Sequence, residues 1–280
     1  MRIEIPDSKK IEELKSEMRE GGLEKLHILS DFDRTLTYGS VGGIKTPSII
    51  SILRDGNHLV KGYAEKAHAL FDKYHPIETD PSIPMKEKKK AMQEWWSTHN
   101  RLLIKSGLRK SDLEDIVENG HVKFREGVPE FLDFLHEHDI PLVILSASGC
   151  GDAIQMYFKK YGKDTPNIHY VTNRFNWDEK GKALSPKKPF IHVMNKDETV
   201  LKEFPELYKI IKDRKNVILL GDSVSDLGMI GGFEYDHLIK VGFLNFEYNK
   251  FGDDFRKHFD IVLEGDGDFD AVNQLIRDLK

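Results

Sequence analysis

The sequence has little cysteine, no long apolar run and no excess of positive charge. Its single cysteine, Cys150, excludes an internal disulfide and fits a reducing compartment. No apolar run approaches the roughly 20 residues that a membrane-spanning helix needs. The formal net charge of −5 argues against a nucleic acid polymer or a membrane surface as partner, because both favour a clustered basic excess.

The N-terminal residues 1–20 are charged and amphipathic, without the basic start and continuous apolar stretch of a secretory signal. We therefore expect a cytoplasmic location. The chain has 280 residues, of which 39% are hydrophobic, so it can bury a sizeable core. This length suits one large domain or one domain that carries a smaller insert. The oligomeric state stays open.

Short apolar runs bounded by polar residues alternate with helical patterns through most of the chain. Such runs are typical of the buried strands of a parallel sheet. We expect strands at 26–29, 141–145, 168–171, 217–220, 238–241 and 261–263, and helices at 8–20, from 129, at 152–161 and at the C-terminus. This alternation predicts an α/β fold in which ligands bind beyond the carboxyl ends of the strands.

A helical section interrupts this alternation. Residues 63–74 and 92–103 each carry apolar side chains at the spacing of an amphipathic helix. The segment between them, Pro76 to Pro84, is acidic and punctuated by proline, so we expect a loop there. The chain is therefore predicted to consist of a core, residues 1–45 and 126–280, and a helical insert, residues 46–125.

The clearest chemical motif is Asp31-Phe-Asp33-Arg-Thr35, directly after a predicted strand. Residues two apart on extended backbone project to the same side, so Asp31 and Asp33 can face one pocket. One carboxylate can then attack phosphorus as a nucleophile while the other protonates the leaving oxygen and later activates water. An isolated D-x-D is more often a polar strand end followed by a turn, but the full motif is much more specific.

A second acidic motif, Gly221-Asp222-Ser223-x-x-Asp226, also follows an apolar strand. Mg²⁺ takes hard oxygen ligands, typically one or two carboxylates, and Asp222 beside Asp31 would complete such a set. Asp226, four residues later, could hold a metal-bound water or orient a lysine. A Gly-Asp-Ser sequence alone is commonly a helix cap. The helix-cap interpretation is less favoured here, because Asp31 already gives the chain one strand that ends in a carboxylate.

Two further candidates depend on these motifs for their meaning. Ser146 ends the predicted strand 141–145, and its hydroxyl with the following N–H groups can hold a phosphate. Lys196 can supply the positive charge that a phosphoryl transition state needs. Alone, the serine would more often be a helix cap and the lysine a solvated surface residue.

In this order, Asp31-x-Asp33-x-Thr35, Ser146, Lys196 and Gly221-Asp222-x-x-x-Asp226 resemble the four motifs of the haloacid dehalogenase superfamily of phosphatases. A longer resemblance, from about residue 28 to the C-terminus, is to the cytosolic pyrimidine 5′-nucleotidase family, also called the type III cytosolic 5′-nucleotidases. It is carried by Tyr74-His-Pro-Ile-Glu78, Glu94-Trp95-Trp96, Pro166-Asn-Ile-His169, Val217–Ser223, Ile239–Asn245 and Asp260–Glu264.

The resemblance implies an α/β fold with a Rossmann-like parallel sheet core and an inserted helical cap. Asp31 would be the nucleophile and Asp33 the general acid and base. Mg²⁺ would be bound by the Asp31 side chain, the Asp33 carbonyl and Asp222, with Thr35 and Asp226 in support. Ser146, the Ala147 N–H and Lys196 would hold the phosphate, and Glu78 would contact the nucleoside.

The sequence also departs from the family pattern. The family usually has Ser-Ala-Gly at the second motif, whereas Ser146-Ala-Ser-Gly-Cys-Gly151 has an extra residue. His99 falls where some relatives carry a small substrate-contacting residue, and its helical phase equally permits a packing role. Arg34 replaces a commonly apolar residue. Trp95 and Trp96 are, at this spacing, more often core residues of the insert than platforms for a base.

One acidic cluster is set aside. Asp266-Gly-Asp268-Phe-Asp270 resembles the start of a calcium loop, but its sixth and twelfth positions are Ala271 and Arg277 instead of glycine and glutamate. We interpret it as a solvated turn.

We expect hydrolysis of a pyrimidine nucleoside 5′-monophosphate such as UMP or CMP through an aspartyl-phosphate, with Mg²⁺ as cofactor. The same architecture accommodates 7-methyl-GMP. The family also transfers the phosphoryl group to a nucleoside acceptor. A second hypothesis is a small-metabolite phosphatase of the phosphoserine type. A third is a signalling module phosphorylated on Asp31 without turnover, against which Asp33 argues because a second carboxylate promotes hydrolysis.

Overall fold

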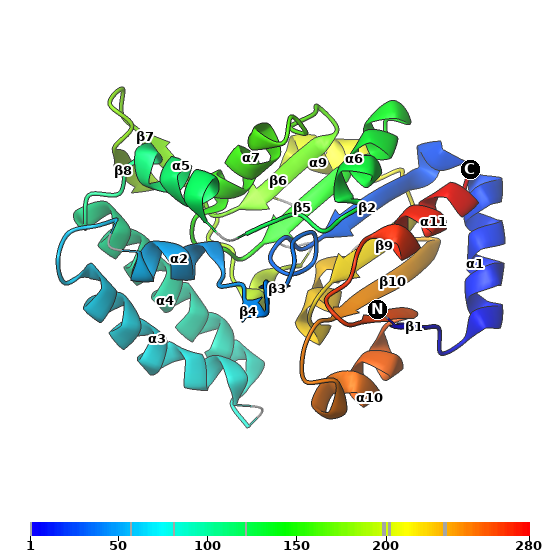
Figure 1. The fold of residues 1–280 in the computed structure, drawn as a ribbon, viewed down its shortest axis with the longest axis horizontal. Helices are drawn as coiled ribbons and strands as arrows, with labels where there is room; N and C mark the ends of the chain where they lie inside the picture. The colour runs from blue at the N-terminus through cyan, green and yellow to red at the C-terminus, as the bar shows by residue number, and fades with distance from the viewer. Residues whose placement is uncertain are drawn as a thin grey trace.

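A mostly parallel seven-stranded sheet forms the centre of the chain (Figure 1), in the order β1-β11-β10-β9-β2-β5-β6. The computed structural model describes residues 2–56, 58–80, 82–120, 122–197, 200, 203–231 and 234–280. The strands of this sheet are β1 (Arg2–Glu4), β2 (Leu26–Ser30), β5 (Leu142–Ser146), β6 (Ile168–Thr172), β9 (Asn216–Gly221), β10 (His237–Leu244) and β11 (Ile261–Glu264). The six strands expected from the sequence are confirmed, and β1 adds an antiparallel edge beside β11.

Alternate residues of the central strands pack into two separate cores on opposite faces of the sheet. Ile28, Ile144 and Ile218 belong to one core, and their neighbours Leu29, Val143 and Leu219 to the other. The first core is covered by α1 (Ser8–Gly21), α6 (Val128–Glu137), α7 (Gly151–Lys160) and α11 (Asp270–Asp278), and the second by α9 (Pro205–Ile211) and α10 (Tyr248–His258). This three-layer arrangement is the Rossmann-like core predicted from the sequence.

Strand register brings the polar strand ends to one edge of the sheet. Ser30 pairs with Leu220 of β9 and with Ile144 of β5. The N–H of Asp31 continues the ladder by donating to the Leu220 carbonyl at 3.1 Å. Asp31, Ser146 and Asp222 therefore leave neighbouring strands at the same carboxyl edge, where parallel α/β sheets bind ligands.

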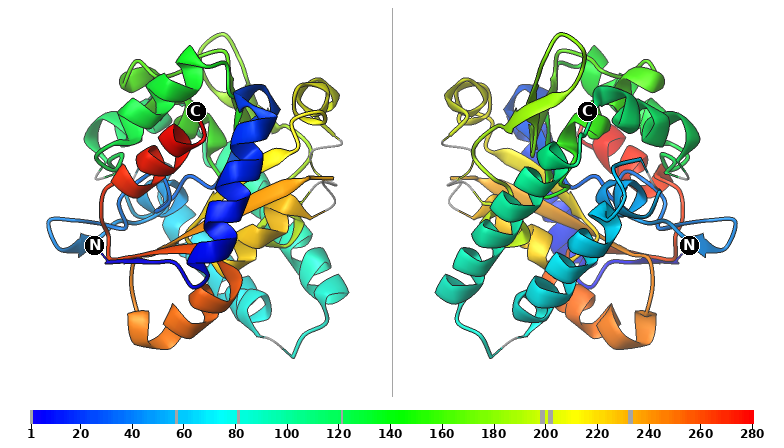
Figure 2. Two further views of the ribbon diagram at one scale, coloured as in Figure 1. Left: turned by 90° about the vertical axis from the view of Figure 1, so that its right-hand side faces the viewer. Right: turned by 90° about the vertical axis from the view of Figure 1, so that its left-hand side faces the viewer.

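A helical cap lies beyond this edge. It contains α2 (Ile49–Asp55), α3 (Tyr63–Thr79), α4 (Met85–Lys105) and α5 (Lys110–Asn119). Figure 2 shows α3 and α4 side by side and away from the sheet. The chain leaves the core through a small hairpin, β3 (Ser40–Val41) and β4 (Ile44–Lys45). The inserted helical cap is thus present, while its boundaries at residues 46 and 125 remain a proposal.

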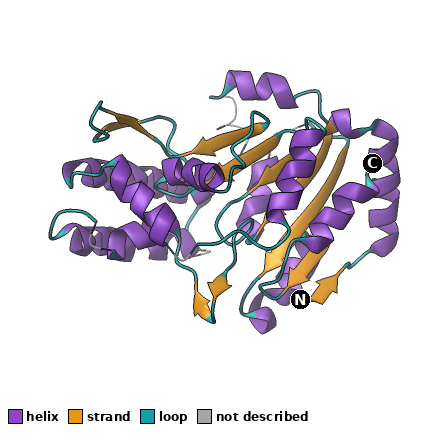
Figure 3. Cartoon of the chain, turned by 45° about the horizontal axis from the view of Figure 1, so that its top comes forward, coloured by secondary structure: helices purple, strands orange, loops and turns teal. Residues whose placement is uncertain are grey.

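Further short elements, including the three 3₁₀ helices named below, lie among the described residues. A hairpin of β7 (Phe175–Trp177) and β8 (Ala183–Pro186) projects from the core near α4 (Figure 3). Three 3₁₀ helices, η1 (Leu23–Lys25), η2 (Val193–Asn195) and η3 (Val224–Ile230), connect larger elements. The hairpins, β1, α9 and α10 were not predicted from periodicity. Among the described residues, no helix is both long and apolar enough to cross a membrane.

The loop expected between Pro76 and Pro84 is wrong over its first residues, because α3 continues through Pro76 to Thr79. A proline inside a helix removes one backbone donor. Here the last turn is held by other groups: the Pro76 carbonyl accepts from the Asp80 N–H, and Lys88 Nζ donates to the Glu78 carbonyl at 3.0 Å. These contacts satisfy carbonyls that would otherwise lack partners at the helix end.

His27 on β2 gives the fold a pH dependence. Burial lowers its pKa to about 4, although its Nδ1 lies 2.6 Å from the Arg214 carbonyl. The unfolded chain therefore takes up the proton first as pH falls. We expect the neutral imidazole to contribute stability fully above about pH 6.5 and to lose about 3 kcal/mol of it between pH 6.5 and 4.

The measurement is urea unfolding at a series of pH values for wild type and His27→Asn, whose amide keeps a donor but does not titrate in this range. The free energy of unfolding of the variant should decrease less steeply below pH 6.5. Equal slopes for the two proteins would contradict the assignment.

Candidate active site

A cavity of about 560 Å³ lies between the carboxyl edge of the sheet and the cap. Nine of the ten residues singled out from the sequence line it: Asp31, Asp33, Glu78, His99, Ser146, Ala147, Lys196, Asp222 and Asp226. Thr35 is the exception. Its side chain is fully buried outside the cavity, and its hydroxyl has no hydrogen-bond partner among the described residues. The structure thus shows no contact through which the Thr35 hydroxyl supports the site.

Lys196 is the cation at the base of the cavity. Its buried ammonium donates to Asp31 Oδ1 at 2.6 Å and to Asp226 Oδ1 at 2.9 Å. Burial works against the charged form, but Asp226 and Asp31 outweigh it and raise the pKa of Lys196. The lysine therefore stays protonated beside Asp31, as a residue that holds a phosphoryl group requires.

Asp226 fixes this arrangement from the loop after β9. Its Oδ2 accepts the backbone N–H groups of Asp222 and Ser223, while Oδ1 receives Lys196. Ser223 caps η3, so the helix-cap interpretation holds for Ser223 and Asp226 together. The expected orientation of Lys196 by Asp226 is present as a direct contact.

Burial and repulsion between neighbouring carboxylates raise the pKa values of Asp31, Asp33 and Asp222. Burial, followed by the nearby Asp226, raises the pKa of Asp31 to about 6, against the opposing charge of Lys196. Burial and the charge of Asp31 raise the pKa of Asp33 to about 7. The pKa of Asp222 is raised well above its ordinary value by burial and by Asp226 and Asp31. This cluster carries more negative charge than Lys196 alone balances.

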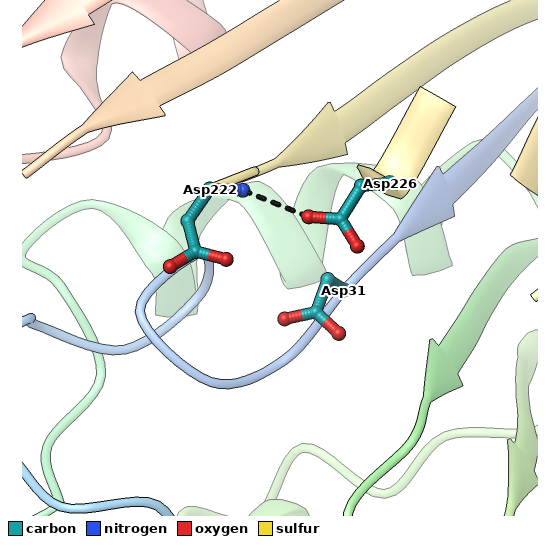
Figure 4. A group of neighbouring side chains, drawn as sticks. All are labelled: Asp31, Asp222 and Asp226. Carbon is teal, nitrogen blue, oxygen red and sulfur yellow. Dashed lines mark hydrogen bonds between the residues drawn. The ribbon is translucent and has the colours of Figure 1, made fainter. Parts of the chain in front are cut away.

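The acidic cluster fits a hard divalent cation. Oxygen atoms of Asp31, Asp222 and Asp226 all lie within 4.8 Å of one another (Figure 4). Asp226 already uses both oxygens and Asp31 Oδ1 accepts from Lys196, whereas neither oxygen of Asp222 accepts a hydrogen bond among the described residues. The carboxylates available to a cation are therefore those of Asp31 and Asp222, with Asp226 behind them. The set that the resemblance implies, which adds the Asp33 carbonyl, stays a prediction.

The loop after β5 presents a hydroxyl and backbone groups to the same cavity. Ser146 Oγ accepts the N–H of Ser148 at 3.1 Å, which folds the loop back on itself. Asn173 Nδ2 donates to the carbonyls of Ala147 and Ser148 at 3.4 and 3.2 Å. Gly149 of this loop lies against the cap: a Cβ there would lie 2.8 Å from Trp96 Cζ3.

A row of stacked rings in the cap reaches the cavity, which is lined by three of them, Trp95, Trp96 and His99. Tyr74, Trp95, Trp96 and His99 stack in sequence with centroid separations of 5.8–5.9 Å and interplanar angles of 11–15°. Trp95 and Trp96 are only half-buried and line the cavity, so they are more than core residues of the insert. Their exposed faces can stack with a planar base.

His99 packs inside the cap and also lines the cavity, while its contact with a substrate stays a prediction. Its Nε2 is hydrogen-bonded to the Tyr63 hydroxyl at 3.0 Å, and its ring also faces the cavity. Burial and the nearby Arg54 lower the pKa of His99 to about 4, so the ring is neutral at physiological pH. Glu78 lines the cavity close by, with Oε2 3.0 Å from His75 Nδ1.

Sequence reasoning missed several cavity residues. Arg54 and Ser51 on α2 and Phe71 on α3 line the cap side, and Arg34 lines the side of the core. Phe71 lies on the helical pattern found in the sequence, but helical phase alone does not distinguish a core position from a cavity wall. No sequence signal singled out Arg54 or Ser51.

Comparison with known proteins identifies the family. The model of the pyrimidine 5′-nucleotidase (UMPH-1) family matches residues 34–280. The chain belongs to this pyrimidine 5′-nucleotidase family. It is 34% identical over 276 residues to the 7-methylguanosine phosphate-specific 5′-nucleotidase A of Xenopus laevis, covering 98% of this chain and 94% of the relative. The human 7-methylguanosine phosphate-specific 5′-nucleotidase is 34% identical over 269 residues, 96% of this chain and 89% of the relative.

The structure of this 5′-nucleotidase family member is also similar to solved ones. A crystal structure of cytosolic 5′-nucleotidase IIIB bound to cytidine superposes with a TM-score of 0.88 at 29% identity, covering 99% of this chain and 93% of that one. A haloacid dehalogenase family hydrolase from Salmonella enterica, with a TM-score of 0.54 at 15% identity over 95% of this chain and 80% of that one, shares the fold. The chain is a phosphoric monoester hydrolase, which excludes the signalling module without turnover.

The contact between Gly149 and Trp96 makes a prediction about cap packing. Gly149→Ala places a methyl group 2.8 Å from Trp96 Cζ3 and 3.1 Å from Ile50 Cδ1. We expect overpacking to lower the free energy of unfolding by about 1–3 kcal/mol, measured by urea denaturation. The same change in a Trp96→Phe background should cost less, because the smaller ring leaves room. Additive effects of the two changes would contradict this contact.

Proposed function

We propose that the chain is a Mg²⁺-dependent 5′-nucleotidase that hydrolyses pyrimidine nucleoside 5′-monophosphates of the UMP and CMP type. The observation that carries this proposal is one cavity with Asp31 and Lys196 at its base and stacked aromatic rings on its cap side. The base of the cavity suits a phosphate and the cap side a planar base. A relative named as cytosolic supports a cytoplasmic location.

Asp31 is the proposed nucleophile. A carboxylate oxygen of Asp31 attacks phosphorus, the bond from phosphorus to the ester oxygen breaks, and Asp33 gives its proton to that oxygen. The product nucleoside leaves an aspartyl-phosphate on Asp31. Asp33 then takes a proton from water, whose oxygen attacks phosphorus, and Asp31 is released with inorganic phosphate. If a nucleoside hydroxyl takes the place of water, the same step transfers the phosphoryl group.

The environment of Asp33 supports this double role. Burial and the charge of Asp31 raise the pKa of Asp33 to about 7, so both of its protonation states are accessible near neutral pH. A general acid and base works best when its pKa lies near the working pH. Lys196 remains charged beside Asp31 and would hold the phosphate with Ser146 and the Ala147 N–H.

Mg²⁺ would be held by the carboxylates of Asp31 and Asp222 and by the Asp33 carbonyl. When bound, it neutralises negative charge on the carboxylates and on the phosphate. The raised pKa values of Asp31 and Asp222 support this need, because without a further cation their negative charges are poorly compensated.

A second substrate, 7-methyl-GMP, is favoured by a separate observation. The relatives from Xenopus and human are named for 7-methylguanosine phosphate. A methylated guanine carries positive charge, which the faces of Trp95 and Trp96 and the carboxylate of Glu78 would attract. A small ester such as phosphoserine would leave these cap residues without a partner, so the cavity does not favour it.

The first test is phosphate release from UMP, CMP, 7-methyl-GMP, phosphoserine and p-nitrophenyl phosphate, with and without Mg²⁺. We expect Mg²⁺-dependent release from the nucleotides. Asp31→Asn removes the nucleophile and should abolish it, with a loss of at least about 10⁴-fold. Release from phosphoserine alone would keep the mechanism and overturn the substrate. Mg²⁺-independent release would overturn the proposed cofactor.

Base recognition is tested at Glu78. Glu78→Gln removes a charged acceptor from the cavity, so we expect kcat/KM for CMP to fall by about 10- to 100-fold. Hydrolysis of p-nitrophenyl phosphate, which has no base, should change little. Glu94→Gln is the matched control, since Glu94 binds Tyr74 on the same cap but does not line the cavity. Equal losses on both esters would exclude a role for Glu78 in base recognition.

A further inference from the structure

Arg125 is a fully buried guanidinium at the point where the chain returns from the cap to the core. All of its N–H groups are directed at oxygen atoms of three separate loops. Nε donates to the Thr35 carbonyl at 2.8 Å, and Nη2 to the Arg34 carbonyl at 2.6 Å and to Asn245 Oδ1 at 2.7 Å. Nη1 donates to Asp266 Oδ1 at 3.1 Å and to the Gly267 carbonyl at 2.7 Å.

Two of these bonds hold the loop that carries Asp33. Arg34, the next residue, adopts a φ of 62°, a left-handed conformation that costs a non-glycine residue energy. Its carbonyl accepts from both Arg125 Nη2 and Asn245 Nδ2, and its N–H donates to Thr37 Oγ1 at 2.8 Å. The turn after Asp33 therefore depends on contacts from outside its own loop.

Asp266 contacts both the Arg125 guanidinium and the segment that runs from the core to the cap. Its carboxylate accepts the N–H groups of Gly39 and Ser40 at 2.7 and 2.5 Å and the Ser40 hydroxyl at 2.8 Å. Asp266 is mostly buried, so the solvated turn expected from the sequence is wrong at this residue. The Arg125–Asp266 pair thus contacts both the outgoing and the returning connection to the cap.

The two connections also pair directly with each other. Thr37 and Phe124 form an antiparallel bridge, the Tyr38 N–H donates to the Lys123 carbonyl, and the Arg125 N–H donates to the Leu36 carbonyl. The planar guanidinium of Arg125 has five N–H donors, so it can bond all five of its oxygen acceptors at once. A lysine ammonium has only three donors and cannot. Arg125 is therefore the residue on which the loop of Asp33, both connections and two strand ends converge.

We propose that Arg125 is a positioning residue for the hydrolytic reaction, which holds Asp33 in place through the Arg34 and Thr35 carbonyls and ties that position to the base of the cap. This inference rests on the proposed role of Asp33 as general acid and base. Asp266 and Asn245 complete the arrangement, which we call the Arg125 clamp. Arg125 itself does not line the cavity.

The clamp predicts an effect that depends on the leaving group. A nucleoside alkoxide needs a proton from Asp33 as it leaves, whereas p-nitrophenolate leaves without one. In Arg125→Lys we expect kcat for CMP to fall by about 100-fold with KM nearly unchanged. The first turnover of p-nitrophenyl phosphate should be nearly as fast as in wild type. Its second step still needs Asp33, so a burst of about one p-nitrophenol per site should precede slow turnover.

Arg214→Lys is the matched control. Arg214 also donates to backbone carbonyls, those of Leu23, Leu26 and Asp139, at the opposite end of the sheet. It should lower stability without producing a burst of p-nitrophenol. If Arg125→Lys instead slows the first turnover of p-nitrophenyl phosphate as much as it slows CMP hydrolysis, or reduces only the fraction of active protein, the positioning role is overturned.

Hydrogen exchange provides a readout that does not require turnover. In Arg125→Lys we expect the amides of residues 34–40 and 125 to exchange together about tenfold or more faster, and in Arg214→Lys to remain as in wild type. Unchanged exchange at residues 34–40 would overturn the clamp. If the wild-type protein hydrolyses neither ester, the proposed function fails by itself, and the exchange data alone decide whether Arg125 holds this loop.

Discussion

The burial of several carboxylates around one lysine is the constraint on which the rest of the site depends. Lys196 lies between Asp31 and Asp226 and receives both as hydrogen-bond acceptors. Taking these charges out of water is costly unless each is paired or hydrogen-bonded. The backbone N–H groups of Asp222 and Ser223 satisfy the second oxygen of Asp226, but no comparable donor reaches Asp222 among the described residues. The carboxylate of Asp222 is thus available to a further cation beside Asp31, which supports the proposed metal-assisted reaction.

The cap has a different physical task from the core. Strands β2, β5 and β9 hold Asp31, Ser146 and Asp222 on backbone that is fully buried and hydrogen-bonded on both sides. The cap lines the opposite side of the cavity with rings on α3 and α4 and with the carboxylate of Glu78, where the proposed function places the base of the substrate. A cavity closed by such a cap excludes water, which strengthens the interactions of charged groups inside it. In the proposed function, the reaction therefore takes place at the sheet edge, and the helices of the cap select the substrate.

The sequence allowed the sheet and the chemical residues to be predicted because both leave local signals. A buried parallel strand is a short apolar run, and Asp31 and Asp222 each follow one directly. Contacts between distant segments leave no such signal. The last turn of α3, beyond Pro76, receives a hydrogen bond from Lys88 of the next helix, and Trp96 packs closely against Gly149 of a distant loop. Proline rules and helical phase describe one segment at a time, so they could not anticipate either feature.

Asp266 shows most clearly why a local pattern can mislead. By spacing it belongs to an acidic turn with Asp268 and Asp270, and such turns are usually solvated. Its burial follows from two residues far away in the chain, Arg125 and Ser40, which converge on it at the base of the cap. An inserted domain must leave and re-enter the core at neighbouring points, and backbone groups at that junction need partners. A buried arginine and aspartate meet this need with directional bonds that also reach the loop of Asp33. The residues that connect the cap to the core therefore also hold the loop that carries Asp33.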